Sequence, residues 1–170
     1  MANCLNLSTA TVRGYICGAP VEALGEIVEA KIIPASAVTS VALTGRTLSW
    51  VLSGKGVTIQ GANNAIVLNI ATKGGEAYNL AYDPTITVVA PAEFYFSAPG
   101  GGAVGDEGFL VALKFSNNRI YVVGAYSPLS VISIEGASNV NQNATLTFGV
   151  DDWQSGTTIY STTTTEYDKA

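Results

Sequence analysis

Two short apolar runs, separated by four polar residues, constrain this chain more than any other feature. The runs are Phe109–Phe115 and Ile120–Val123, and the link is residues 116–119, with the sequence SNNR. Asn adopts positive φ more readily than most residues, so Asn117 and Asn118 suit a two-residue hairpin turn. The sequence therefore predicts a β-hairpin that turns at these two residues.

This turn predicts a cross-strand register that gathers apolar side chains on one face of the hairpin, because strand side chains alternate with period 2. The expected pairs are Phe115 with Ile120, Leu113 with Val122, and Val111 with Gly124. The opposite face is expected to be mixed and wetter, and it carries Lys114, Tyr121, Ser116 and Arg119. A hairpin with one apolar face must pack on further strands. The β-branched run 129–135 and the alternating segment 143–150 can supply them.

Further strand-like segments recur at spacings near ten residues with turn residues between them, a pattern typical of an all-β sandwich or barrel. They are residues 11–16, 26–33, 38–43, Thr47–Leu52, Val57–Gln60, 65–71, 85–90 and 93–97. Residues 44–46 and 61–64 are each expected to close a hairpin, and residues 73–76 to form another turn. Pro91 lacks an N–H donor, which suggests a sheet edge or a bend.

One segment, residues 20–30, could instead form a helix. Val21, Leu24 and Val28 have helical spacing, but Gly25 in the middle costs about 1 kcal/mol relative to Ala. A strand through residues 26–33 is favoured, because Pro34 follows two isoleucines and ends the segment like a strand. The predicted fold is all-β, an antiparallel β-sandwich or barrel with at most one short helix and a long Gly-rich loop at residues 98–108.

The charge content is unusually low. Charged residues make up 12% of the 170 residues, about half of what is typical, and the net charge is −5. The chain therefore either exposes a bland polar surface or covers much of its surface with partners. The eight basic residues are scattered, which argues against a grip on nucleic acid. The length suits one domain.

Signals for membrane insertion or secretion are missing from the sequence. No apolar stretch approaches the roughly 20 residues of a membrane span, and the first twenty residues do not resemble a cleaved signal peptide. Cys4 and Cys17 match no zinc or redox spacing. They are either reduced thiols of a protein made in a cytosol or a disulfide closing an N-terminal hairpin. The glycosylation sequons at Asn6 and Asn143 are attributed to chance.

The sequence contains few groups that could carry reactive chemistry. The chain has no histidine, which removes Ser-His and Cys-His nucleophile pairs and imidazole metal sites. Residues 100–105 match G-x-G-x-x-G literally, but Asp106, Glu107 and a strand follow where a helix N-terminus should hold phosphate. We expect a mobile or interface loop there. Residues 53–56, with the sequence SGKG, are expected to be a hairpin turn.

The remaining candidates also favour structural roles. Asp151 and Asp152 could be half of a carboxylate pair, but a solvated turn is the better interpretation. Trp50 and Trp153 are isolated in the sequence, so core or interface packing is expected for both. We therefore predict no catalytic, cofactor-binding or metal-ligating residues and no enzymatic activity.

The C-terminal residues 157–167 are strongly β-prone but barely apolar. They are either a frayed tail or a strand that pairs with a neighbouring subunit. We expect the second, and therefore a single β domain over residues 1–170 with an extended Thr-rich tail at about 157–170. Deleting the tail is predicted to leave a folded subunit that assembles poorly.

The hairpin 113–124 (LKFSNNRIYVVG), the run 131–134 (VISI), and residues 143–148 (NATLTF) after a polar connection form one block. This block resembles the C-terminal half of tail-tube-type virion proteins of tailed bacteriophages. The start, Met-Ala-Asn-Cys4 with a later Cys17, is also similar to some of those proteins. The Gly-Tyr that often precedes their last strand is replaced here by Gln142-Asn143.

The resemblance implies a structural virion protein whose copies form stacked, hexameric rings around a DNA conduit. The implied partners are copies of itself, other virion proteins, and DNA that passes without specific binding; no membrane and no cofactor are implied. The protein would be made in the bacterial cytoplasm and reside in the virion. The alternative is a capsid decoration or head-fibre type β module, for which trimers are expected instead of sixfold rings. A small binding or enzyme domain is the third possibility. It is disfavoured because the sequence suggests no catalytic, cofactor-binding or metal-ligating residues.

Overall fold

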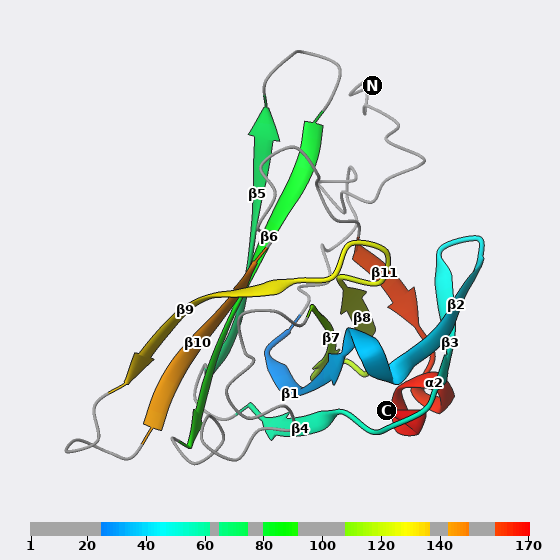
Figure 1. The fold of residues 1–170 in the computed structure, drawn as a ribbon, viewed down its shortest axis with the longest axis horizontal. Coiled ribbons are helices and arrows are strands. Elements are labelled where there is room, and N and C mark those ends of the chain that lie inside the picture. The colour runs from blue at the N-terminus through cyan, green and yellow to red at the C-terminus, as the bar shows by residue number, and fades with distance from the viewer. Residues whose placement is uncertain (1–24, 62–64, 75–79, 92–107, 137–142, 150–158) are drawn as a thin grey trace, which may run out of the picture.

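The computed structural model describes residues 25–61, 65–74, 80–91, 108–136, 143–149 and 159–170. These residues form two β-sheets and one short C-terminal helix, as Figure 1 shows, which confirms the predicted all-β sandwich class. Most of the predicted Gly-rich loop lies outside the described residues, as do residues 20–24 of the alternative helix.

The larger sheet, sheet A, has seven strands. In spatial order they are β2 (Val38–Thr44), β3 (Thr47–Leu52), β11 (Ile159–Thr162), β8 (Ile120–Val123), β7 (Phe109–Phe115), β1 (Ile27–Pro34) and β4 (Val57–Gln60). A 3-10 turn, η1 (Ala35–Ala37), joins β1 to β2, and the helix α2 (Thr164–Lys169) follows β11. Strand β1 confirms the preference for a strand over a helix at this position.

The smaller sheet, sheet B, has the order β5 (Ile66–Gly74), β6 (Leu80–Pro91), β10 (Asn143–Gly149) and β9 (Ser130–Gly136). Its inner face packs on one face of sheet A and forms the first core, in which Ile86 and Phe148 meet Leu113. The other face of sheet A encloses a second core, in which Trp50, Val122 and Tyr167 are buried. Sheet A is therefore covered on both faces over much of its area.

The central hairpin is present, but its predicted register is wrong by one residue. Leu113 is opposite Tyr121, and Val111 is opposite Val123. The turn is a three-residue loop, because the Asn118 N–H donates to the Phe115 carbonyl and the Phe115 N–H donates to the Arg119 carbonyl. Asn118 takes the positive φ of 61° that such loops require.

A shift of one residue moves every side chain of one strand to the other face. Leu113 and Phe115 therefore face sheet B, whereas Ile120 and Val122 lie in the second core. The prediction of a wetter second face is wrong, because side chains on both faces of the hairpin lie in a core. Lys114, expected on that face, is only partly exposed and lies 5.8 Å from the centre of the Tyr167 ring.

The first predicted hairpin around residues 44–46 is confirmed as β2 and β3, with Gly45 at a φ of 65°. The second is wrong, because β4 pairs with β1 in sheet A, whereas β5 pairs with β6 in sheet B. Residues 53–56 also join strands that do not pair. Strand β5 runs through Gly74, past the start of the predicted turn, and Pro91 ends β6 inside sheet B.

The C-terminal segment is not a tail available for a neighbour. Strand β11 pairs in parallel with β3 and antiparallel with β8, in the interior of sheet A. Helix α2 then buries Tyr167, which is 1% exposed. The prediction that this segment pairs across subunits is wrong for residues 159–170, because β11 pairs with β8 and β3 of its own chain and α2 packs into the second core.

Candidate assembly surfaces

The described ranges contain few of the residues that the sequence suggested as candidates for catalysis or binding. Trp50 is 3% exposed in the second core, as expected, and Lys55 lies in an exposed connection. The others lie outside the described residues: Cys4, Cys17, residues 100–105, Asp151, Asp152 and Trp153. No described group of three or more His, Cys, Asp or Glu side chains could hold a metal ion. Within the described ranges, no helix is long and apolar enough to span a membrane.

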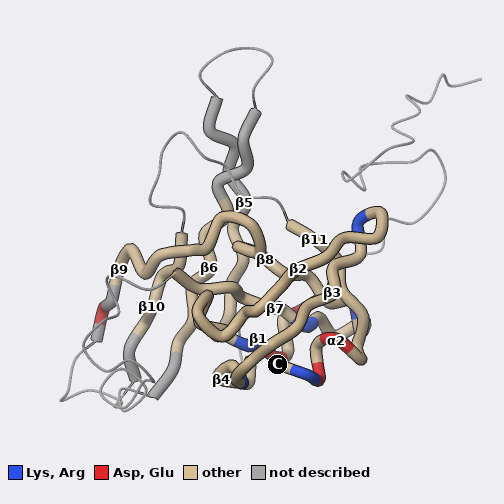
Figure 2. The backbone as a smooth tube through the Cα atoms, turned by 45° about the vertical axis from the view of Figure 1, so that its right-hand side comes forward, with Lys and Arg blue, Asp and Glu red and all other residues tan. Residues whose placement is uncertain are grey.

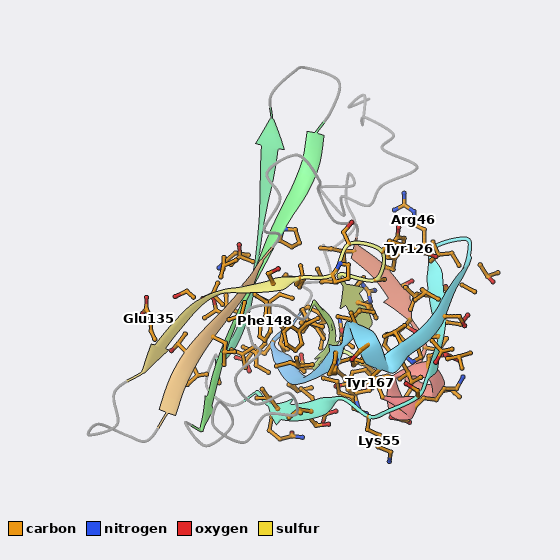
Figure 3. All side chains as sticks on the ribbon, in the orientation of Figure 1. Arg46, Lys55, Tyr126, Glu135, Phe148 and Tyr167 are labelled. Carbon is orange, nitrogen blue, oxygen red and sulfur yellow. The ribbon has the colours of Figure 1, made fainter. Side chains whose placement is uncertain are left out.

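The most organised polar cluster surrounds Tyr167 of helix α2, which is labelled in Figure 3 between β1 and that helix. Its hydroxyl donates to Glu29 Oε1 at 2.8 Å. Lys31 Nζ donates to the Tyr167 carbonyl at 3.0 Å and lies 4.6 Å from the centre of its ring. Burial raises the pKa of Tyr167, and the hydrogen bond to Glu29 raises it further. The phenol is therefore held neutral, as a donor.

Glu29 completes this cluster on strand β1. It also accepts from Gln60 Nε2 at 2.7 Å. Burial acts to raise the pKa of Glu29, but the hydrogen bonds from Tyr167 and Gln60 and the nearby Lys114 and Lys31 outweigh it, so the pKa is lowered. The carboxylate thus stays ionised with its partners in place.

Helix α2 is also anchored to strand β3. The Trp50 backbone N–H donates to Glu166 Oε2 at 3.1 Å, and the Trp50 indole N–H donates to the Glu166 carbonyl at 2.9 Å. An ion pair with Lys169, reinforced by the Trp50 hydrogen bond, lowers the pKa of Glu166. These contacts attach the C-terminal segment to its own subunit, so we assign the cluster a structural role.

Sequence reasoning missed this anchor, although one local signal was present. Thr163 and Glu166 have the spacing of a capping box, and the Glu166 N–H does donate to Thr163 Oγ1 at 3.2 Å. That pattern predicts a helix start at Thr163. No local pattern could pair Tyr167 with Glu29, which lies 138 residues earlier.

Among the side chains that the structure describes, the outer face of sheet B carries one charge, on Glu135. Its described side chains alternate with the buried ones, and the cross-strand register places Thr87 between Thr147 and Val67. The face comprises Val67, Asn69, Thr85, Thr87, Val89, Ser133, Glu135, Thr145 and Thr147. In Figure 2 the described backbone of sheet B is almost entirely tan, with one red segment on β9. Such a face needs little desolvation of charge to pack against another protein surface.

Sheet B also carries a two-stranded arm. Strand β10 pairs with β6 only from Ile86 to Pro91. Strands β5 and β6 continue to pair beyond that point, from Asn69 opposite Thr85 to Gly74 opposite Leu80. Figure 1 shows this ribbon extending away from the rest of the molecule. A two-stranded ribbon is marginally stable in water by itself, so packing against another surface would stabilise the arm.

The edges of the two sheets differ in how well they are protected against pairing with other chains. Strand β4 has four residues, and β9 has a bulge at Ile132 in its middle and carries Glu135. Strand β2 has seven residues without a charge, and most of them are exposed. Short length, bulges and charges normally blunt an edge. Strands β2 and β5 are thus the longest weakly protected edges among the described strands.

No protein-family model matches this chain, and no curated protein or solved structure does either.

Proposed function

We propose that this protein is a structural subunit that assembles with copies of itself. The observation that carries the proposal is the arm, because six successive pairs of β5 and β6 extend past β10 with no third strand among the described residues. A surface on a second copy would cover this ribbon and stabilise it. Assembly also accounts for the low charge content of 12%. Surface that is buried between subunits does not face water, so it needs no charged side chains to keep the protein in solution.

We further propose that the assembly is a phage particle component, a tail tube or tail ring through which DNA passes. The resemblance of residues 111–148 to tail-tube-type proteins supports this assignment. The outer face of sheet B supports it as well, because its described side chains include one carboxylate and no cation that could bind phosphate. Such a surface suits a conduit wall that must not hold DNA.

Shortening the arm tests self-assembly. In the variant, residues 70–84 are replaced by Asn-Gly, which joins Asn69 to Thr85, an opposed pair of β5 and β6, through a two-residue turn. We expect the variant to unfold cooperatively, since both cores lie outside the arm, but not to assemble. The control is Lys55→Ser in an exposed connection away from the arm, which should assemble like the original protein. Light scattering measures assembly, and circular dichroism measures folding.

Electron microscopy of the purified full-length protein tests the particle type. Sixfold rings or tubes support the tail assignment. Threefold particles would replace it with the capsid decoration or head-fibre alternative. A full-length protein that stays monomeric at high concentration would refute self-assembly itself.

A further inference from the structure

We propose that the β5 edge of one copy pairs with the β2 edge of a second copy, so that sheet B of each subunit continues into sheet A of the next. This inference rests on the proposed self-assembly and specifies its interface. Strand β5 is an edge strand of sheet B, and β2 is an edge strand of sheet A. Figure 1 shows them on separate sides of the molecule, so they do not meet within one subunit.

Strand length favours this pair of edges. The β5 edge is nine residues long, including the part in the arm, and a pairing strand of similar length is needed to satisfy its backbone groups. Strand β2 offers seven residues, whereas β4 offers four. The bulge in β2 falls at Thr39, near one end, which leaves Ser40 to Thr44 in regular register. The bulge in β9 interrupts the middle of that edge instead.

Side chains and charge favour the same pair. Leu43 on β2 and Val67 on β5 are each 38% exposed, so each edge leaves an apolar side chain incompletely covered. Residues 38–44 carry no charge, and Lys73 is the one charged residue of β5, so no like charges oppose each other in either strand direction. The β6 side of the arm is a poorer edge, because it contains Asp83 and Pro84, which are typical edge-blocking residues.

The pairing joins two different edges, so it is head-to-tail. A head-to-tail contact closes into a ring or continues as a filament, depending on the rotation between subunits. A pairing of β2 with β2, in contrast, would stop at a dimer. The two arrangements therefore predict different behaviour of mixtures.

Single lysine substitutions at each edge test the pairing. Leu43→Lys places a charge on the β2 edge, and Val67→Lys places one on the β5 edge; both side chains already reach solvent, so both variants should stay folded. Each variant alone is expected to remain monomeric at concentrations at which the original protein assembles. The matched control is Val51→Lys, which lies at a 58% exposed position of β3, between β2 and β11 in sheet A, and should assemble normally.

An equimolar mixture of the two edge variants gives the decisive result. The intact β5 edge of the Leu43→Lys chain can pair with the intact β2 edge of the Val67→Lys chain, so the mixture should form 1:1 heterodimers and nothing larger. Native mass spectrometry or sedimentation velocity detects them. Assembly by either single variant alone, or a mixture that stays monomeric, overturns the pairing but leaves self-assembly through the arm standing. Failure of the unmodified protein to assemble overturns both proposals.

Discussion

At the scale of single residues, Tyr167 is the largest fully buried side chain among the described residues, and it lies in the second core. It is 1% exposed, and its hydroxyl donates to the Glu29 carboxylate. Tyr167→Phe should lower the free energy of unfolding by about 1.5–3 kcal/mol, the usual range for a hydrogen bond to a charged group. Tyr167→Ala should cost more, about 3–5 kcal/mol, because it also leaves a cavity.

Urea unfolding of these variants checks the prediction. The exposed Tyr126 provides the control, since Tyr126→Phe removes a hydroxyl from a side chain that is 55% exposed and should change stability little. If Tyr167→Phe unfolds at the same urea concentration as the original protein, the hydrogen bond to Glu29 contributes nothing to stability.

The same cluster predicts how stability depends on pH. The pKa of Glu29 is lowered in the folded state, so its contribution is present above the ordinary pKa near 4.5 and is lost as pH falls through the folded pKa. The pKa of Tyr167 is raised above its ordinary value of 10.0, so folding holds the phenol neutral and stability falls as pH rises above about 10. We expect stability to decline at both extremes.

Two variants separate these contributions. Glu29→Gln should flatten part of the acid-side decline, and Tyr167→Phe should flatten the alkaline-side decline, because each removes the titrating group. Thermal melts across the pH range, compared with the unmodified protein, measure both slopes. An unchanged alkaline slope in Tyr167→Phe would show that other groups control it.

Asn118 provides a residue-scale test of the turn. Its φ of 61° is in the left-handed region, which a β-branched side chain rarely adopts. Asn118→Val should destabilise the protein by about 1–2 kcal/mol, whereas Asn118→Gly should be close to neutral. Chemical denaturation measures both, and Ser116→Val is the comparison, because Ser116 is exposed and no positive φ is required there. Equal losses for Val at both positions would argue against the three-residue loop.

At the scale of elements, the C-terminal segment joins two parts of sheet A. Strand β11 lies between β3 and β8, so without it the β2–β3 hairpin loses its strand contacts to the rest of the sheet. Ending the chain at residue 158 also removes Tyr167 from the second core. We therefore expect this truncation to abolish cooperative unfolding, the reverse of what the Thr-rich sequence suggested.

Circular dichroism and thermal melting of the truncated chain test this expectation. The control keeps the segment and changes an exposed position of α2, as in Thr165→Ala, which should melt like the original protein. A truncated chain with an unchanged cooperative melt would show that β11 and α2 are dispensable for folding.

At the scale of the whole molecule, the charge content predicts how assembly responds to salt. Of the two strands proposed to pair between copies, β2 has no charged residue and β5 has one, Lys73. Assembly through these surfaces should change little when salt is raised from about 0.05 M to about 0.5 M, because screening acts on charges that are scarce there. Light scattering at several salt concentrations measures this. A steep loss of assembly in salt would point to ion pairs as the main attraction instead.

Local pattern in the sequence was sufficient for the fold class and for most strand positions. Alternation with period 2 and turn residues such as Gly45 depend on neighbouring residues only, which is why β1, β2, β3, β7 and β8 were correctly expected. The candidate surfaces could not be predicted from local sequence pattern, because whether a strand lies at an edge depends on the order of strands in the sheet. The virion role remains a prediction from resemblance and surface character.

The sequence by itself therefore determined that this chain forms β-strands and where most of them begin. Beyond the β2–β3 and β7–β8 hairpins, tertiary structure alone decided which strands pair. A loop one residue longer than expected also put Ile120 and Val122 on the opposite face of the central hairpin from Leu113. It also decided that the barely apolar segment Ile159–Thr162 lies inside sheet A. The physical reason is that strand partners are chosen by hydrogen bonds and burial between segments far apart in the chain, here residues 47–48 and 120–123, and no local pattern encodes that choice.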